Sequence, residues 1–252
     1  MAMQSKQDVP LEIAHILFID TVGYSKLSTA QQHELFDILN RAVRGTERFR
    51  AAEAAGKLIR LPTGDGMALV FYDAPESPIA CAVEISRAIR DLPQLRLRMG
   101  IHSGPVSRVV DVNDRCNLAG VGINMAERIM NCADAGHILL SQRAAADLAE
   151  DERWRSHLYQ LGECEGKHGA RLHLVNFYTE EVGNLGVPNR FVQSQNRFSA
   201  RLLLHWRALL STATLLLAVA LLGYHYLTRS PPPVASPPPP AKSIAVLPFE
   251  NL

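Results

Sequence analysis

The sequence predicts a mixed α/β (α+β) domain, a ferredoxin-like sandwich, followed by one transmembrane helix. Two observations support this. Residues 11–180 alternate short apolar stretches with helical periodicity in the order β-α-β-β-α-β, followed by further elements. From Ala208 to Leu227 the chain then reads ALLSTATLLLAVALLGYHYL, without one Asp, Glu, Lys or Arg. We therefore expect a compact domain first and an apolar segment after it.

The elements are predicted from hydrophobic period and from turn residues. Ile13–Ile19 is an apolar strand, and Thr29–Ala55 has helical periodicity with Leu35, Leu39 and Val43 on one face. The later predicted elements are strands Lys57–Leu61 and Met67–Phe71 joined at Pro62–Gly66, helix Pro78–Arg90, a hairpin of Leu95–His102 and Val106–Val110 turning at Ser103–Pro105, helix Leu118–Asn131, strand His137–Leu140, helix Gln142–Ala149 and strand Arg171–Tyr178.

The composition narrows the class of partner and the compartment. A formal net charge of +1 offers no electrostatic footprint for nucleic acid, which usually meets a basic stripe. The four cysteines stand far apart with no C-x-x-C pair, which is typical of reduced thiols in a cytosolic domain. No apolar run precedes the first predicted strand, so no signal peptide is expected.

The apolar segment has the length of a membrane span. Twenty helical residues cover roughly 30 Å, the thickness of the hydrocarbon core, although a buried core helix is the alternative. Four arginines precede the segment (Arg190, Arg197, Arg201 and Arg207), whereas only Arg229 and Lys242 follow it closely. The positive-inside rule then predicts a single-pass protein of the inner (plasma) membrane with the N-terminal domain in the cytoplasm and the C-terminus outside.

These shifts in composition predict five regions. Residues 1–184 form the folded domain, 185–206 a basic juxtamembrane linker and 207–228 the transmembrane helix. Residues 229–242 contain PPPVASPPPP, typical of a stiff polyproline II spacer, and 243–252 resemble the first strand of a further region. A lone strand cannot bury its faces, so we expect this chain to be the front part of a longer protein.

Two aspartates are candidate metal ligands. Asp20 ends the first apolar strand, and Asp65 lies between two glycines in the turn linking two predicted strands. Each has a structural alternative, since aspartate commonly caps helices and forms turns. Together they could present two carboxylates from adjacent strand ends, which a pair of Mg²⁺ ions on a triphosphate requires.

A third candidate is the stretch from Asn124 to Arg128. These two residues are four apart and would share a helix face, and Asn117 would lie two turns earlier on about the same face. Arginine suits a bidentate phosphate contact and asparagine a ribose or base edge, whereas a solvated helix face is the alternative.

Five motifs occur in order at fixed spacings and together resemble the class III adenylate/guanylate cyclases. They cover roughly residues 12–180 and read FIDTVGYS (18–25), TGDGMALVF (63–71), LRMGIHSGPV (97–106), NLAGVGINMAER (117–128) and KHG (167–169). Within that family the chain is similar to bacterial forms that join a cyclase domain to a transmembrane helix and a C-terminal repeat region. The resemblance implies an intracellular signalling enzyme that makes a cyclic nucleotide and pyrophosphate from a nucleoside triphosphate.

The resemblance also implies a role for each matching residue. Asp20, Asp65 and the carbonyl of Thr21 would bind two Mg²⁺ or Mn²⁺ ions, and Gly23 would let the backbone approach the triphosphate. Asn124 would orient the ribose, and Arg128 would stabilise charge at the α-phosphate while the 3′-oxygen attacks. The implied contacts of the β- and γ-phosphates are Arg98 and Lys167.

Family sites lie across a dimer interface, and this chain carries both halves, so the resemblance implies a homodimer with two sites.

The two base-selecting positions match Leu61 and Asn117. Leucine has no hydrogen-bonding group and asparagine both donates and accepts, so neither distinguishes adenine from guanine or even a pyrimidine. ATP is favoured only as the commonest substrate of the family. A nucleotide-binding or dimerisation module without turnover is the competing hypothesis; a cyclic-dinucleotide-forming domain is disfavoured because its GG[DE][DE]F-type signature is absent.

Overall fold

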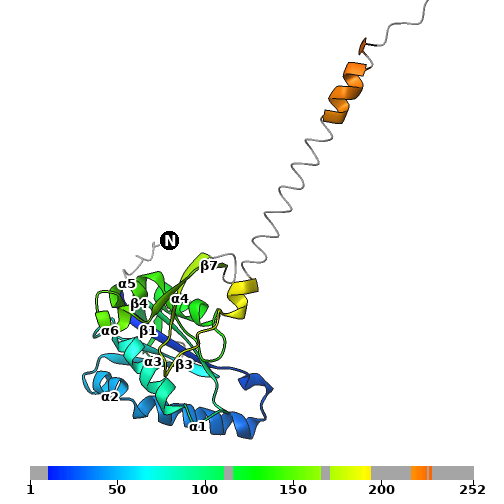
Figure 1. Ribbon diagram of the computed structural model, residues 1–252. Coiled ribbons are helices and arrows are strands. Elements are labelled where there is room, and N and C mark those ends of the chain that lie inside the picture. The colour runs from blue at the N-terminus through cyan, green and yellow to red at the C-terminus, as the bar shows by residue number, and fades with distance from the viewer. Residues whose placement is uncertain (1–10, 111–115, 166–170, 194–216, 226, 229–252) are drawn as a thin grey trace, which may run out of the picture. The chain divides into compact units, whose positions relative to one another are not determined.

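The computed structural model describes residues 11–110, 116–165, 171–193, 217–225 and 227–228 (Figure 1). The chain divides into two units, Met1–Ser199 and Ala200–Leu252. In the first unit the strands are β1 (Glu12–Thr21), β2 (Leu58–Pro62), β3 (Gly66–Phe71), β4 (Leu97–Val110), β5 (Cys116–Ala119), β6 (Ile138–Ser141), β7 (Leu158–Glu165) and β8 (Arg171–Phe177). The helices are the 3-10 turn η1 (Tyr24–Lys26), α1 (Thr29–Gly45), α2 (Glu47–Ala54), α3 (Ser77–Ala88), α4 (Val121–Met130), α5 (Gln142–Leu148) and α6 (Glu152–Arg155).

One mixed sheet organises this unit. Within the described residues its order is β2-β3-β1-β4-β6-β8-β7, and β5 pairs with β4 alone. The first four strands pair antiparallel in the order β2-β3-β1-β4, whereas β6 joins β4 in parallel. This is the split β-α-β-β-α-β arrangement that the sequence predicts, extended by four further strands, β5 to β8.

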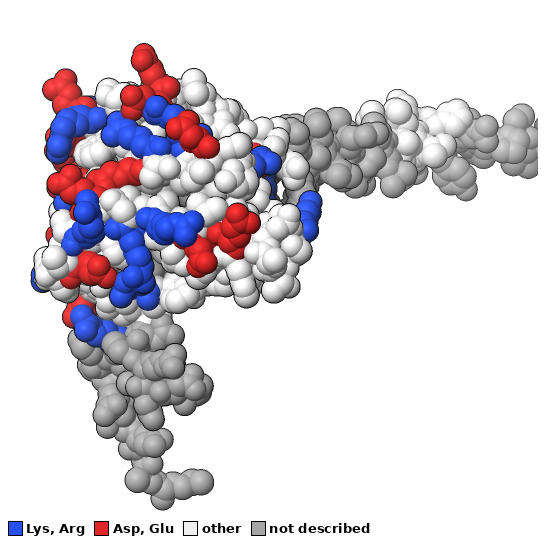
Figure 2. Space-filling view, turned by 90° about the horizontal axis from the view of Figure 1, so that it is seen from below, with Lys and Arg blue, Asp and Glu red and all other residues white. Residues whose placement is uncertain are grey.

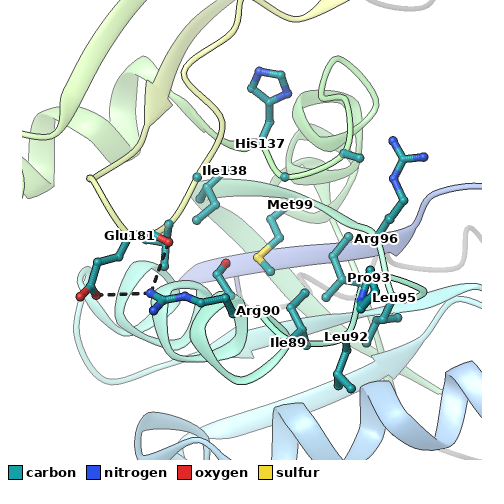
Figure 3. A pocket seen from close by; sticks show the side chains of 16 residues that line it. Ile89, Arg90, Leu92, Pro93, Leu95, Arg96, Met99, His137, Ile138 and Glu181 are labelled. Atoms are coloured by element: carbon teal, nitrogen blue, oxygen red, sulfur yellow. Dashed lines mark hydrogen bonds and ion pairs between the residues drawn. The ribbon is translucent and has the colours of Figure 1, made fainter.

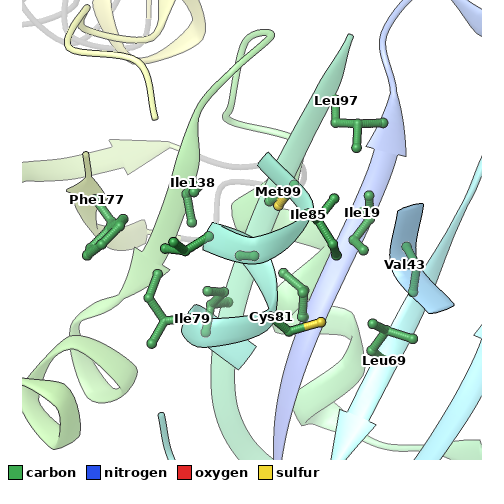
Figure 4. Packing of buried hydrophobic residues seen from close by; sticks show 14 of the residues in the cluster. Ile19, Val43, Leu69, Ile79, Cys81, Ile85, Leu97, Met99, Ile138 and Phe177 are labelled. Atoms are coloured by element: carbon green, nitrogen blue, oxygen red, sulfur yellow. The ribbon is translucent and has the colours of Figure 1, made fainter. Parts of the chain in front are cut away.

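Helices cover both faces of the sheet because β1 is apolar on both of its sides. Leu17 and Ile19 pack into the larger core cluster with residues of α1, α2 and α3 (Figure 4). Ile16 and Phe18 point the other way, into a second cluster that contains Ala126 of α4. The even-numbered residues of β1, including Asp20 at its end, therefore share the face that carries α4.

The predicted helix from Thr29 to Ala55 is wrong in one respect, since two helices form. Thr46 has an extended backbone (φ −69°, ψ 144°) and separates α1 from α2. Its hydroxyl donates to the carbonyl of Val43 at 2.8 Å and accepts from the amide of Phe49 at 3.3 Å. A buried threonine thus satisfies the backbone at both new helix ends, which hydrophobic periodicity does not report.

The predicted hairpin at Ser103–Pro105 is also wrong, because β4 runs unbroken from Leu97 to Val110. Pro105 pairs in register with Ile13 near the beginning of β1. A β-carbon on Gly104 would lie 2.6 Å from Nε2 of His102 and 3.1 Å from the Cα of Gly122 in α4. The glycine therefore lies in a crowded part of a strand, paired with Ala14, instead of in a turn.

The predicted helix Leu118–Asn131 begins too early. Residues 116–119 form β5, in which Asn117 pairs with Val109, and α4 begins at Val121 after Gly120 (φ 146°). Asn117 is consequently not on a helix face with Asn124, and the predicted three-residue stripe does not exist.

Of the described elements, β5, β7, α6 and η1 were not predicted at all. The β7 strand lies at the edge of the sheet and alternates apolar and polar residues only loosely.

Gly100 is the tightest contact between α4 and the sheet, and it yields a stability prediction. A β-carbon there would lie 2.4 Å from the Met130 amide nitrogen and 2.6 Å from the Ala126 carbonyl oxygen. Gly100→Ala must move α4, and we expect it to lower the free energy of unfolding by about 1–3 kcal/mol. Gly45→Ala is the control, since its β-carbon meets nothing within 4 Å. Equal urea midpoints for the two variants would contradict the packing described.

The surface of the first unit mixes charges of both signs. In the view from below, Lys and Arg side chains alternate with Asp and Glu side chains, and neither sign covers a broad area of that face (Figure 2).

In the second unit, residues 217–225 are helical. No helix within the described part of the chain is long and apolar enough to cross a membrane. Half of the predicted span Ala208–Leu227, residues 208–216 and 226, lies outside the described residues.

Candidate functional site

The fold brings Asp20 and Asp65 together where β1 ends and β3 begins. Asp20 pairs in register with Gly66, so Asp65 is the residue just before its partner strand. The Thr21 amide donates to the Asp65 carbonyl oxygen at 3.1 Å and holds the turn against the strand end. The adjacency predicted for the two aspartates is therefore present.

Arg98 lies on the other side of Asp20. The two residues are directly opposite in the β1–β4 register, and Nε of Arg98 donates to Oδ2 of Asp20 at 2.6 Å. The side chain of Asp20 is 8% exposed and that of Arg98 is 21% exposed, so this ion pair is largely shielded from water. The resemblance implies that Arg98 holds phosphate; here its guanidinium is bound to a carboxylate.

Burial dominates the electrostatics of Asp20. It raises the pKa of this carboxyl from 3.8 to about 6; the Arg98 ion pair opposes the shift, and the nearby Asp65 carboxyl, with which it shares a hydrogen bond, adds to it. Two carboxyl groups this close disfavour double ionisation unless a cation lies between them. The pair therefore resembles a cation site more than a structural ion pair.

This donor set fits a divalent cation. Carboxylate oxygens are preferred ligands of Mg²⁺, which usually keeps several waters and binds substrate phosphates besides one or two carboxylates. Among the described residues no group of three or more His, Cys, Asp or Glu side chains could hold a metal ion. The other ligands would thus come from the Thr21 carbonyl, water and a bound triphosphate.

The metal-free protein should show the strain of this arrangement in its pH dependence. Because the folded-state pKa of Asp20 is raised, its stabilising contribution is complete below about pH 4 and is lost as the pH rises through about 6. With chelator present, we expect the free energy of unfolding of the wild type to fall by up to about 3 kcal/mol over this pH range. Asp20→Asn should abolish this fall. Urea unfolding between about pH 4 and pH 7 measures this, and parallel curves for the two proteins would contradict it.

Gly23 occupies the turn that follows β1. Its φ is +86°, a conformation that side chains rarely adopt, and a β-carbon there would meet nothing within 4 Å. The Lys26 amide donates to the Gly23 carbonyl and closes the turn η1. No side chain fills the space next to this turn, which lies three residues after Asp20.

Asn124 and Arg128 both lie on α4, one turn apart. Asn124 is exposed and Arg128 half-buried, and the side chain of neither forms a hydrogen bond or ion pair with the described residues. Within the described residues no hydrogen bond or ion pair joins either side chain to Asp20 or Asp65. The candidate residues therefore form two groups, one at the strand ends and one on α4.

Leu61 lies on β2 beside the group at the strand ends. It pairs with Ala68 and packs, half-buried, on the sheet face that carries α4. Its neighbour Arg60 points to the other face, where it pairs with Glu53 at 2.8 Å. Of the other two predicted contacts, Asn117 is placed only by its backbone, and Lys167 lies outside the described residues.

A separate cavity of about 380 Å³ contains none of the predicted residues. It lies between the end of α3, the beginnings of β4 and β6, and residues 181–183, and the Arg90–Glu181 ion pair lies at one side of it (Figure 3). Its wall includes Leu97 and Met99, whose side chains face away from Asp20 and Arg98. The carboxylate pair is thus not part of this pocket.

Comparisons with known proteins find similarity to nucleotide cyclase domains. Residues 66–177 match the model described as the Adenylate and Guanylate cyclase catalytic domain. That range includes Arg98, Asn124 and Arg128 and begins one residue after Asp65. The matched range and the fold are both similar to the catalytic domains of adenylate and guanylate cyclases.

The individual proteins that are similar to this chain have sequence identities of 17–30%. "Putative adenylate cyclase 3" of Rhizobium meliloti (strain 1021) is 30% identical over 144 residues, which is 54% of this chain and 23% of that protein. The chain thus spans about a quarter of the length of this curated relative. Two solved structures share the fold. The guanylate cyclase domain of RhGC from Catenaria anguillulae in complex with GTP has a TM-score of 0.56 at 21% identity, with 68% of this chain and 98% of that one covered. The adenylyl cyclase CyaB from P. aeruginosa has a TM-score of 0.55 at 17% identity, with 70% and 100% covered.

Proposed function

We propose that this protein is a membrane-anchored nucleotide cyclase that converts ATP into cyclic AMP and pyrophosphate for intracellular signalling. The observation that carries the proposal is the Asp20–Asp65 carboxylate pair at adjacent strand ends, with Arg98 opposite in register. A purely structural role would favour one buried ion pair, whereas a second carboxylate beside it raises the pKa of the first. The unfavourable proximity of two carboxyl groups is explained if the pair binds a cation.

Each residue then has a chemical task in the proposed reaction. Asp20 and Asp65, with the Thr21 carbonyl, would hold two Mg²⁺ or Mn²⁺ ions. Such ions would supply the positive charge that lowers the pKa of the ribose 3′-hydroxyl and stabilises the pyrophosphate leaving group. Arg98 and Lys167 would bind the β- and γ-phosphates.

The group on α4 would act from a partner subunit. Asn124 orients the ribose, and Arg128 stabilises the negative charge that develops at the α-phosphate. Both side chains are free of partners among the described residues, as expected of groups that meet their ligand only in an assembly. Because one chain carries both halves, a symmetric homodimer would contain two complete sites.

ATP is the proposed substrate, and GTP is the alternative. Leu61 offers the base an apolar contact on the catalytic face and no hydrogen bond. The two solved structures of nearly equal similarity are a guanylate cyclase domain and an adenylyl cyclase. A pyrimidine triphosphate is a third candidate substrate, because Leu61 makes no hydrogen bond that would select a purine.

The membrane anchor is proposed from the uncharged run between Ala208 and Leu227 and from the arginines before it. Residues 217–225 of that run are helical, and their side chains are exposed, Leu217, Leu221 and Leu222 among them. The anchor would hold the catalytic unit at the cytoplasmic side of the inner membrane. Partition of the full chain into the membrane fraction, and its release by deletion of 207–228, would test this.

Product identification is the decisive experiment. The full chain is incubated with Mn²⁺ and each of the four nucleoside triphosphates separately, and cyclic products and pyrophosphate are quantified. We expect cyclic AMP from ATP. If only cyclic GMP forms, the substrate is GTP instead of ATP. Tight nucleotide binding by a folded dimer without any cyclic product would favour a binding or dimerisation module instead.

A further inference from the structure

The chain that follows β8 returns across the end of α4. We call residues 184–193 the C-terminal strap. It lies beyond the predicted domain boundary at residue 184, yet it packs on the domain and belongs to the first unit. Three hydrogen bonds tie it to the loop after α4: Asn184 Nδ2 to the Ala135 carbonyl (3.0 Å), His137 Nε2 to the Gly186 carbonyl (2.8 Å) and the Asn189 amide to Asp134 Oδ2 (2.7 Å).

Arg190 reaches the end of α4 itself. Its Nη1 donates to the carbonyl oxygen of Asn131, the C-terminal cap residue of the helix, at 2.6 Å. The last carbonyls of a helix lack intrahelical partners and carry partial negative charge. A guanidinium at this point satisfies one carbonyl and complements the helix dipole.

Phe191 anchors the strap beside that contact. It is 8% exposed and packs in a cluster with Ile129 of α4, Cys132 and Leu139. The strap therefore holds the last turn of α4 with a buried aromatic ring and a charged hydrogen bond from adjacent residues. The chain continues from here towards the proposed membrane anchor.

The last turn of α4 carries Arg128. The Cys132 thiol donates to the Arg128 carbonyl at 3.4 Å, so the residues that the strap contacts hold the backbone of Arg128. The Arg128 side chain has no hydrogen bond of its own with the described residues that could correct a displacement. Its position therefore depends on the helix end.

We infer that Arg190 is a positioning residue, which holds the last turn of α4 and thereby aims Arg128 at the reacting phosphate. The inference rests on the proposed function. It assigns residues 184–193 to the catalytic machinery instead of to a linker.

Kinetics of the full chain test the inference. We expect Arg190→Ala to lower kcat about ten-fold with little change in KM, because a misplacement of about 1 Å can cost up to 10²-fold. Arg190→Lys, which keeps the charge and a donor, should recover most of the rate. The melting temperature should change little, since Arg190 is exposed. Arg153→Ala is the matched control: it removes an exposed arginine, paired with Asp151, and should leave kcat unchanged.

A double-mutant cycle separates positioning from general weakening. If Arg190 acts through Arg128, Arg190→Ala should cause no further loss in an Arg128→Ala background. Equal fold losses in the two backgrounds, or a rise in KM alone, would overturn the inference. If the wild type forms no cyclic product, the proposed function fails, and hydrogen exchange still tests the strap. Arg190→Ala should speed exchange in the last turn of α4, and unchanged exchange there would overturn the positioning role.

Discussion

Asp65→Ala is expected to abolish cyclic-nucleotide formation, with a loss of at least about 10³-fold in kcat. Removing one of two carboxylates from a cation site forfeits several kcal/mol of charge stabilisation, and each 1.36 kcal/mol is a factor of ten in rate. The same change removes a negative charge that raises the pKa of Asp20, so the metal-free domain should be at least as stable as the wild type. Initial rates with Mn²⁺ and thermal unfolding with chelator measure the two effects.

The control for this variant is Asp73→Ala. Asp73 is exposed and follows β3 at the end opposite to Asp65, so its loss should change neither rate nor stability appreciably. A second readout is metal-dependent stabilisation. Mn²⁺ should raise the melting temperature of the wild type and not that of Asp65→Ala. Normal turnover by a folded Asp65→Ala protein would remove the carboxylate pair from the mechanism.

Arg128→Ala should produce a loss of similar size by a different route. Arginines that stabilise the transition state of phosphoryl transfer contribute about 10³–10⁵ in rate, and we expect kcat to fall within that range. KM should change much less, because the charge that Arg128 meets develops only in the transition state. The half-buried Arg128 side chain has no partner among the described residues, so its truncation should not unfold the domain.

Mixing experiments connect the two variants. If the sites form between subunits, a heterodimer of Asp65→Ala and Arg128→Ala chains has one site with both defects and one with neither. Combining the two inactive proteins should therefore restore activity, to at most half of the wild-type rate per dimer. Arg41→Ala, which removes an exposed arginine of α1, is the control for arginine loss. Failure of the mixture to recover activity, with subunit exchange verified, would contradict a site shared between two chains.

Local patterns were informative where an element buries its side chains by simple periodicity. The β1 and β3 strands are short apolar runs, and the sequence predicted both to within about two residues. Their adjacency followed from the β-α-β-β-α-β order, and with it the meeting of Asp20 and Asp65. The roles of Asn124 and Arg128 depended on the resemblance to a family, since an exposed helix face carries no chemical signal by itself.

The errors share a physical cause, which is that distant contacts decided the local conformation. Thr46 interrupts a helical pattern because its hydroxyl satisfies both new helix ends. Gly104 lies in a strand instead of a turn because it pairs with Ala14 of β1. Asn117 belongs to a strand because β4 extends far enough to pair with it.

The sequence by itself determined the fold class, the neighbouring aspartates and the presence of all the candidate residues in one chain, because these depend on the order of elements and on residue identity. Only the tertiary structure decided that Arg98 faces Asp20 in register, that Leu61 shares the sheet face that carries α4, and that residues 184–193 contact the end of α4. Strand register and packing across elements are set by contacts between residues far apart in the chain. Periodicity along one segment cannot report such contacts.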